Sequence, residues 1–138
     1  NSEMVRNELA WAIEDAKISA DAINYINAHG TSTPANDAME TIAIKRLLGD
    51  KAYQVPISST KSMLGHALAA SGAIEVIACA LMLQEQVIHP TINLDNPDPA
   101  CDLDYVPHNT RDVKDMTIIL SNSFGLGGQN ASIVLGKI

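Results

Sequence analysis

Two histidines stand where α/β proteins place reactive groups, and a lysine stands close to one of them. His29 follows the run INYIN, which we interpret as a strand over residues 23–28, and it opens a loop that contains glycine, threonines and proline. His66 follows Gly65 at the start of a stretch rich in small residues, five positions after Lys61. Loops at the carboxyl ends of strands carry catalytic groups in such folds. The alternative interpretation is that each histidine is simply a solvated or core residue and Lys61 a surface lysine.

Three carboxylates accompany these groups. Glu75 lies in an otherwise uncharged run between residues 67 and 84, and a buried carboxylate needs a partner. Lys61 or a bound cation would supply one. Asp37 and Glu40 lie in the first turns of an expected helix, where they could simply complement the helix dipole.

The two cysteines, Cys79 and Cys101, are far apart and form neither a disulfide framework nor a metal motif. Cys79 lies within an apolar helix and is expected to be a small core residue. The loop over residues 125–128, Gly-Leu-Gly-Gly, indicates either a turn or backbone that lies close to a ligand. It is not a phosphate-binding loop of the GxxxxGK[ST] kind. The residues alone therefore indicate candidate bases and donors but no convincing nucleophile.

Composition narrows the class of protein. The chain has 138 residues, with 9 Lys and Arg against 16 Asp and Glu, and this net charge of −7 disfavours nucleic acid as a partner. Hydrophobic residues make up 46%, which is too apolar for a disordered chain. The sequence contains no run of about 18 uncharged apolar residues, the length that a membrane span requires. The first residues lack the layout of a signal peptide.

The elements that must position the reactive groups alternate between helix and strand, which predicts a layered α/β architecture. An apolar helix within residues 60–86 is hydrophobic nearly all round and is expected to be buried. About four strands can hardly bury such a helix, so the chain is interpreted as half of something larger. We also expect a first helix capped by Ser2, a turn capped by Ser19 and a second helix that ends at Gly49. Strands are expected over 23–28 and 55–59, a loop over 90–112, and a hairpin of 117–124 with 131–137.

Four segments carry a family resemblance: NAHGTSTPANDAME, SSTKSMLGHALAASGAIE, PTINLDNPDPACDLDYVP and LSNSFGLGGQNAS. They resemble, in order, the C-terminal half of β-ketoacyl-acyl carrier protein synthases, closest to the synthase II type of fatty-acid elongation. The resemblance implies a thiolase-like αβαβα sandwich, usually a homodimer, in which residues 1–138 form the C-terminal domain. The resemblance also implies that the nucleophilic cysteine belongs to the family's N-terminal half, outside this chain, and neither Cys79 nor Cys101 matches its motif.

The same resemblance assigns roles to the site residues. His29 and His66 match the catalytic histidines, which bind the malonyl thioester carbonyl and promote loss of CO₂. Lys61 matches a lysine that gives the site electrostatic and structural support. Glu40 and Asp37 would join that supporting network.

Further positions match the family's substrate contacts. Thr31 and Thr33 match threonines that hydrogen-bond the phosphopantetheine arm of the carrier protein. Phe124, Gly125 and Leu126 match the acyl gate, whose backbone N–H helps to form an oxyanion hole. The usual pattern there is NSFGFGG, so Leu126 replaces the gating phenylalanine and puts gating and chain-length preference in doubt.

A monovalent cation is a further expectation from the resemblance, at positions that enclose one in related enzymes. These positions are Asn27, Glu75, Ser121 and Asn122. No other cofactor is implied beyond the phosphopantetheine arm.

The implied function is decarboxylative Claisen condensation of acyl groups with malonyl-acyl carrier protein. Its partners would be the acyl and malonyl carrier proteins and the N-terminal half, with no nucleic acid and no membrane span. The expected location is the bacterial cytoplasm, or an organelle. A polyketide or specialised-lipid ketosynthase, or its non-catalytic chain-length-factor partner, is the alternative. A thiolase is disfavoured because the NSFGLGG loop has no cysteine.

Overall fold

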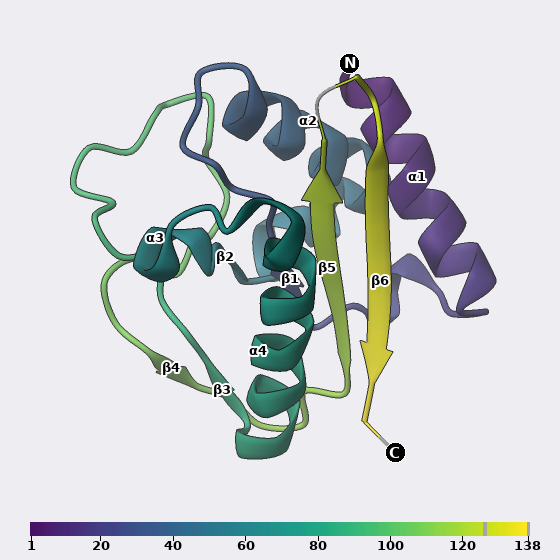
Figure 1. Ribbon diagram of the computed structural model, residues 1–138. Coiled ribbons are helices and arrows are strands. Elements are labelled where there is room, and N and C mark those ends of the chain that lie inside the picture. Colours follow the sequence, from purple (N-terminus) through teal and green to yellow (C-terminus); the bar gives the residue numbers. More distant parts are fainter. Residues whose placement is uncertain (126, 138) are drawn as a thin grey trace.

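A computed structural model describes residues 1–125 and 127–137 (Figure 1). Its main sheet has the strand order β2-β1-β5-β6, and a small second sheet pairs β3 with β4. The elements are α1 (Ser2–Asp15), the 3₁₀ helix η1 (Ala20–Ala22), β1 (Tyr25–Asn27), α2 (Asn36–Leu48), η2 (Gly49–Gln54), β2 (Ile57–Ser58), α3 (Lys61–Leu64), η3 (Leu68–Ala70), α4 (Ser71–Glu85), β3 (Val87–Ile88), β4 (Arg111–Asp112), β5 (Ile118–Phe124) and β6 (Asn130–Gly136).

The main sheet is parallel at its centre. β1 pairs in parallel with both β2 and β5, so the carboxyl ends of these three strands lie at one edge. β6 returns antiparallel to β5 with Phe124 opposite Asn130, which confirms the predicted hairpin. Reactive groups that follow β1, β2 and β5 are therefore brought to the same side of the sheet.

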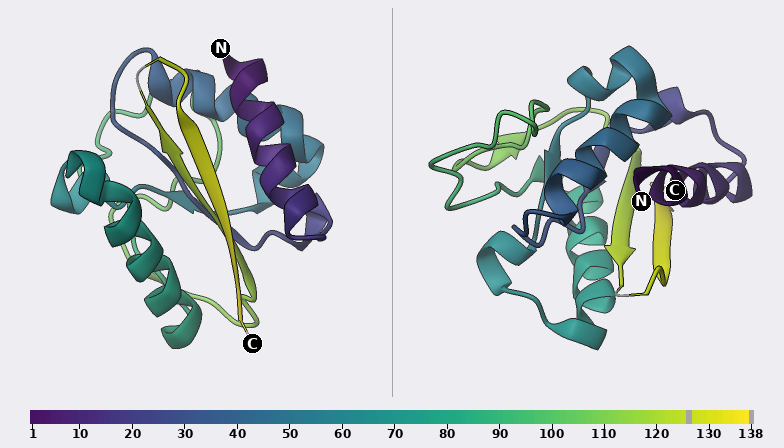
Figure 2. Two further views of the ribbon diagram at one scale, coloured as in Figure 1. Left: turned by 45° about the vertical axis from the view of Figure 1, so that its right-hand side comes forward. Right: turned by 90° about the horizontal axis from the view of Figure 1, so that it is seen from above.

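Helices cover both faces of this sheet, with α1 and α2 on one face and α4 on the other (Figure 2). Alternate residues of each strand point to opposite faces. Ile26 and Leu120 are buried with the side chains of α1 and α2, whereas Tyr25 and Ile119 are buried with those of α4. The predicted α/β layering is thus confirmed, with two apolar cores separated by one sheet.

Several predicted boundaries shift. Asn1, not Ser2, caps α1, because its side chain accepts a hydrogen bond from the Glu3 N–H. Ser19 and Gly49 take the predicted capping positions. The strand predicted over 23–28 is only Tyr25–Asn27, and the one predicted over 55–59 is only Ile57–Ser58.

The segment that contains His66 also differs from the prediction. It is not the start of one long helix: α3 ends at Gly65, His66 lies in the following turn, and α4 begins only at Ser71. Gly65 has a φ of 72°, which lies outside helical backbone and breaks the run. His66 is therefore held by a turn between two helices.

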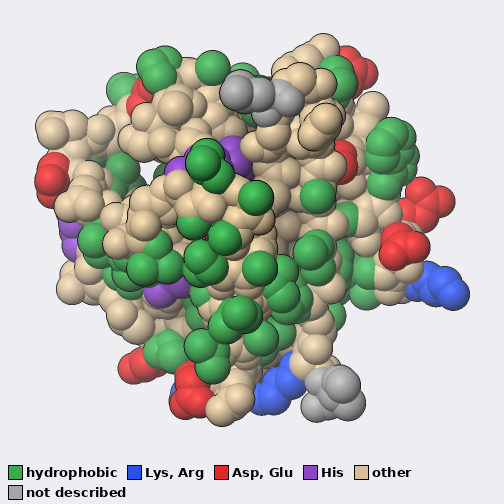
Figure 3. Space-filling view, viewed as in Figure 1, with side chains coloured by type: hydrophobic (Ala, Val, Ile, Leu, Met, Phe, Trp, Pro, Cys, Tyr) green, Lys and Arg blue, Asp and Glu red, His purple; other side chains and the backbone are tan. Residues whose placement is uncertain are grey.

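α4 buries only one of its faces within this chain, as expected of an apolar helix that about four strands can hardly cover. Cys79, Met82 and Leu83 pack on the sheet, while Ile77 and Leu81 are 61% and 54% exposed. Hydrophobic side chains gather on this side of the molecule (Figure 3). By length and mean hydropathy of 1.5, the segment Leu68–Glu85 would pass as a membrane span, a test that core helices of soluble proteins also pass.

The exposed face of α4 predicts association of the isolated chain. Ile77→Gln together with Leu81→Gln should weaken self-association about tenfold or more, since each side chain contributes about 1.5–3 kcal/mol when buried. Sedimentation velocity over a range of concentrations measures this. The matched exposed pair Glu14→Gln and Lys17→Gln on the α1 side should leave association unchanged, and an equal effect of both pairs would contradict the prediction.

A buried carboxylate that the sequence analysis did not single out lies between α1 and β6. Neither carboxylate oxygen of Glu8 has a hydrogen-bond partner among the residues that the structure describes. Burial raises the pKa of Glu8 to about 7, although the neighbouring Ser132 and Asn130 side chains pull the pKa down. The folded chain therefore holds the Glu8 proton over a pH range in which the unfolded chain loses it.

The sign of the resulting pH dependence follows directly. Stability contributed by protonated Glu8 is lost as the pH rises from about 4.5 to about 7. Glu8→Gln should therefore stabilise the fold at pH 8 by about 1 kcal/mol, a value reduced for partial exposure, and should change little at pH 4. Thermal unfolding at both pH values measures this, with the exposed Glu14→Gln as control. Equal shifts at the two pH values would argue against it.

Candidate active site

The backbone around His29 is held by the carboxylate of Glu40. His29 and Gly30 donate their N–H groups to the two Glu40 oxygens, at 2.9 and 3.0 Å. The Asn122 and Asn36 amides donate to the same carboxylate at 3.1 and 3.3 Å. Burial raises the pKa of Glu40 while these hydrogen bonds lower it. Glu40 thus joins β1, α2 and β5 at the point where His29 leaves the sheet.

Gly30 allows this arrangement because it lies against β2. Its φ is +45°, and a Cβ at this position would lie 2.5 Å from Ser59 Cβ. The Ser59 hydroxyl donates to the Gly30 carbonyl at 2.8 Å. A larger residue would push apart the two loops that carry His29 and Lys61.

The imidazole of His29 is buried beside two other rings. Its centroid lies 5.6 Å from that of His66 in an edge-on arrangement, and 5.5 Å from that of Phe124. Burial, reinforced by the charges of Lys61 and His66, lowers the pKa of His29 to about 4. His29 is therefore neutral at pH 7, and its ring offers one N–H donor.

The proton of His66 is placed by its local backbone. The Leu68 N–H donates to His66 Nδ1 at 3.0 Å, and the Ser71 hydroxyl lies 3.1 Å from the same atom. Since Nδ1 accepts, the proton of the neutral ring lies on Nε2. The turn before α4 thus prepares His66 as a donor through Nε2.

Lys61 forms a buried ion pair with Glu75. Both side chains are inaccessible to solvent, and the Lys61 ammonium contacts one carboxylate oxygen of Glu75. The Ser123 hydroxyl lies 3.4 Å from the other oxygen. Of the two partners considered for Glu75, the structure provides Lys61, and the pair ties α3 to α4 beside the histidines.

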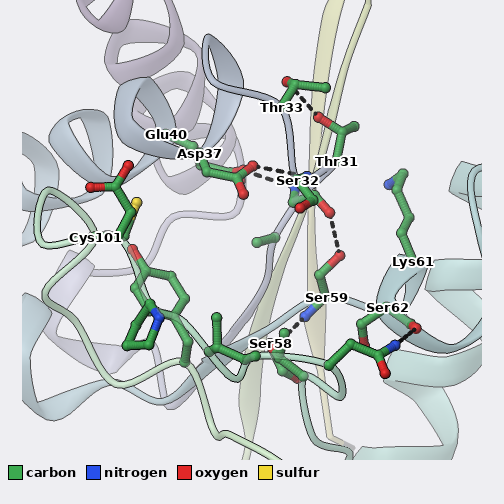
Figure 4. Close-up of a pocket in the computed structure, with 18 of the residues that line it drawn as sticks. Thr31, Ser32, Thr33, Asp37, Glu40, Ser58, Ser59, Lys61, Ser62 and Cys101 are labelled. Atoms are coloured by element: carbon green, nitrogen blue, oxygen red, sulfur yellow. Dashed lines mark hydrogen bonds between the residues drawn. The ribbon is translucent and has the colours of Figure 1, made fainter.

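A cavity of about 630 Å³ opens beside these groups, between the loop after β1 and the loop over residues 91–105 (Figure 4). Thr31 and Thr33 line it, with their hydroxyls 3.1 Å apart. Asp37 accepts a hydrogen bond from the Ser32 N–H at 3.2 Å and so shapes the threonine loop. Asp37 therefore supports this loop, and Glu40 supports the residues before it, His29 and Gly30.

Neither cysteine suits a nucleophilic role, as predicted. Cys79 is fully buried, and burial raises its pKa to about 12. Cys101 lines the cavity, where burial raises its pKa too. The thiolate form, which is the nucleophile, is disfavoured at both positions.

The glycine-rich loop closes the hairpin next to Phe124. The Gly125 N–H donates to the Gln129 carbonyl at 2.8 Å, and a Cβ on Gly125 would lie 2.8 Å from that oxygen. Only glycine fits this closure. Leu126, predicted to replace the gating phenylalanine, lies outside the described residues.

The four residues expected around a monovalent cation have other partners in this structure. Asn27 donates to Ser121 at 3.2 Å, Asn122 donates to Glu40, and Glu75 contacts Lys61. The oxygens of Asn27 and Asn122 accept from Thr60 and Ser132, at 2.9 and 3.0 Å. These side chains thus hydrogen-bond one another and other groups of the protein, and the cation stays a prediction.

Sequence reasoning missed Asn36, Ser132 and the bond from Asn122 to Glu40. Asn36 could have been noticed from its spacing, since it lies one helical turn before Glu40. Ser132 and Asn122 act across a strand pair, and no local pattern indicates such a contact.

Residues 1–95 match the family of β-ketoacyl synthase C-terminal domains. The chain belongs to the β-ketoacyl synthase family. A 3-oxoacyl-[acyl-carrier-protein] synthase 2 from Synechocystis is 53% identical over 94% of this chain and 31% of its own length. The tetracenomycin polyketide synthase ketoacyl synthase alpha subunit of Streptomyces glaucescens is 49% identical over 91% of this chain and 29% of its own length.

Solved structures of ketosynthases are similar in fold to this chain. A β-ketoacyl synthase from Burkholderia phymatum is 40% identical, with a TM-score of 0.93 over all of this chain and 33% of its own. A type II polyketide acyl-carrier protein in complex with its ketosynthase, bound to the hexaketide, gives 45% identity and a TM-score of 0.93 over 96% of this chain and 32% of that one. The fold is therefore thiolase-like, and the chain spans about a third of the length of these relatives.

Loss of the Glu40 carboxylate should loosen the His29 loop. Glu40→Gln turns one acceptor into a donor that faces a backbone N–H, so we expect a destabilisation of about 2 kcal/mol. Chemical denaturation measures it, and the amide protons of His29 and Gly30 should exchange with solvent faster because they lose their acceptor. Glu85→Gln, at the exposed end of α4, is the control. Unchanged stability and unchanged exchange of these amides would contradict the assignment.

Proposed function

We propose that the complete enzyme carrying this domain forms carbon–carbon bonds by decarboxylative condensation of an acyl group with malonyl-acyl carrier protein. The observation that carries the proposal is the pair of imidazoles, His29 and His66, 5.6 Å apart beside the buried Lys61–Glu75 pair. The family membership and the 53% identity to a 3-oxoacyl-[acyl-carrier-protein] synthase 2 support it.

The chemistry asks these residues to stabilise an enolate. The acyl chain is held as a thioester on a cysteine of the N-terminal half, and the malonyl thioester enters beside the histidines. The bond between the malonyl methylene carbon and its carboxylate breaks. CO₂ leaves, and the electron pair of the broken bond forms the enolate. The N–H donors of neutral His29 and of His66 Nε2 hydrogen-bond the enolate oxygen. The carbanion then attacks the acyl thioester, the new bond forms, and the cysteine thiolate leaves.

The donors are effective because they are placed before charge develops. An imidazole N–H binds the uncharged thioester carbonyl of the substrate only moderately. The same hydrogen bond becomes stronger in the transition state, where negative charge develops on that oxygen. Glu75 holds the Lys61 ammonium near His29, where its positive charge helps to lower the pKa of His29 and so favours the neutral imidazole. Removing one such donor typically lowers the rate about 10²–10³-fold.

The carrier protein is proposed to reach the site through its phosphopantetheine arm. The Thr31 and Thr33 hydroxyls line the cavity and are suited to bind the arm's amides. This ketosynthase domain is acidic overall, and Lys45 and Arg46 already contact Asp102 and Ser2. The basic surface that an acidic carrier protein needs is therefore proposed to lie mainly on the N-terminal half.

The assembly and location are proposed with the same function. The exposed face of α4 supports packing against an N-terminal half, within a homodimer. The relatives named above come from bacteria, which supports the bacterial cytoplasm, with an organelle as the alternative. We retain a monovalent cation near Glu75 as part of the proposal.

The decisive experiment is the intact mass of the complete enzyme incubated with acyl-carrier protein, before and after malonyl-carrier protein is added. We expect an acyl adduct that clears with release of CO₂. His66→Ala should keep the adduct but clear it about 10²–10³-fold more slowly. His108→Ala, at an exposed histidine, is the matched control. Failure to form any adduct in a folded dimer would instead support a chain-length-factor-like partner.

A polyketide ketosynthase is the second candidate, and the 49% identical tetracenomycin relative and the hexaketide-bound neighbour favour it. The two candidates differ in what happens to the product. Supplied with malonyl-carrier protein and no reductase, a fatty-acid enzyme should release the β-ketoacyl product after one condensation. A polyketide enzyme should extend the unreduced chain repeatedly, and mass spectrometry of the carrier-bound products distinguishes the two.

A further inference from the structure

His89 lies behind the site, and the proposed function leaves it without a role. It follows β3 and its ring meets Tyr25 edge-on, with the centroids 6.3 Å apart. Its Nε2 atom lies 2.9 Å from the Thr60 hydroxyl, and its Nδ1 atom lies 3.2 Å from the Ser58 hydroxyl. A partly buried imidazole thus bridges two residues at the end of β2.

The direction of these hydrogen bonds follows from the protons available. Thr60 Oγ1 lies 2.9 Å from Asn27 Oδ1, which can only accept, so the hydroxyl proton of Thr60 points to Asn27. Thr60 must then accept from His89, and the proton of the ring lies on Nε2. His89 Nδ1 in turn accepts from Ser58, whose oxygen lies 2.7 Å from the Tyr25 hydroxyl that donates to it.

The opposite tautomer satisfies fewer buried groups. Its Nδ1–H would donate to the Pro90 carbonyl, 3.1 Å away. The single proton of Thr60 would then face two acceptors, His89 Nε2 and Asn27 Oδ1, and the Ser58 hydroxyl would lose its acceptor at Nδ1. Two contacts would thus have no proton, whereas the first tautomer leaves only the Nδ1–Pro90 contact without one. Burial also lowers the pKa of His89, which disfavours the doubly protonated ring.

The resulting chain of donors runs in one direction, from Tyr25 through Ser58, His89, Thr60 and Asn27 to Ser121. Thr60 directly precedes Lys61, and its carbonyl accepts from the first turn of α3. Its hydroxyl makes no helix-capping bond and serves the chain instead. Asn27 is two residues before His29 on β1. This chain of hydrogen bonds therefore joins the backbone segments that carry Lys61 and His29.

We propose that His89, as the neutral ring with its proton on Nε2, is a positioning residue that holds Thr60 and Asn27 and so keeps Lys61 and His29 in register. This inference rests on the proposed condensation. His89 touches no substrate, and its effect is on geometry. A displacement of the order of 1 Å at reacting groups lowers rates about 10²-fold.

The test compares variants of the complete enzyme that keep different halves of the bridge. His89→Gln can place an amide N–H near Thr60, whereas His89→Asn reaches only the Ser58 side and His89→Leu reaches neither. We expect Asn and Leu to lower kcat of the condensation step about tenfold to a hundredfold, with KM for malonyl-carrier protein changed less than twofold. Gln should restore most of kcat. His108→Leu is the matched control.

Acyl-adduct formation separates this proposal from the proposed function. If the unaltered enzyme forms no adduct and releases no CO₂, the proposed function fails. If it does both and all His89 variants match it, or if Gln is as slow as Asn and Leu, the positioning role is overturned. A loss that slows adduct formation and clearing equally, in step with a lower melting temperature, would indicate a structural role only.

A measurement on the unaltered enzyme keeps the proposal testable where variants fail to fold. Histidine labelled with ¹⁵N reports the tautomer of each ring. The signal of His89 is assigned as the one that is absent from a folded His89 variant, or as the one that shows a contact to Thr60. We expect the neutral ring with its proton on Nε2 at pH 7.5. A proton on Nδ1, or a doubly protonated ring, would refute the proposed chain of hydrogen bonds.

Discussion

The arrangement of this site depends on one buried carboxylate. Glu40 accepts from the backbone of His29 and Gly30 and from the side chains of Asn36 and Asn122, so its two oxygens are shared by three elements of the fold. A carboxylate can do this because it only accepts, and each backbone N–H that leaves a strand needs an acceptor. An apolar residue would leave these donors unpaired, and a shorter acid would not reach them.

The neighbouring polar groups follow the same logic at different depths. Lys61 forms an ion pair with Glu75 behind the histidines, whereas His66 takes its orientation from the Leu68 N–H and the Ser71 hydroxyl. The histidines thus differ in environment: His29 is kept neutral by burial and by nearby positive charge, and His66 is oriented by one backbone N–H and one hydroxyl. Polar groups are concentrated at the carboxyl ends of β1, β2 and β5, and apolar cores fill the remaining space on both faces of the sheet.

The sequence predicted what local pattern carries. His29 follows a strand, the hairpin flanks a glycine-rich turn, and Glu75 in an apolar run required a partner, so these features could be anticipated from residue types and spacing. The two-residue strands β3 and β4 are too short to show a period. The bond from Asn122 to Glu40 joins residues far apart in sequence and depends on the pairing of β1 with β5. His89 had no signal of its own, because its role depends on hydroxyls brought to it by the end of β2 and the turn that follows, those of Ser58 and Thr60.

The half-exposed α4 has a consequence for the thermodynamics of this domain. The heat capacity of unfolding grows with the apolar surface that becomes hydrated. Ile77 and Leu81 already face water, so unfolding the isolated domain hydrates less new apolar surface than its length implies. Its stability curve should be flatter with temperature than that of a domain of equal size with covered helices, and steeper once a partner surface covers α4.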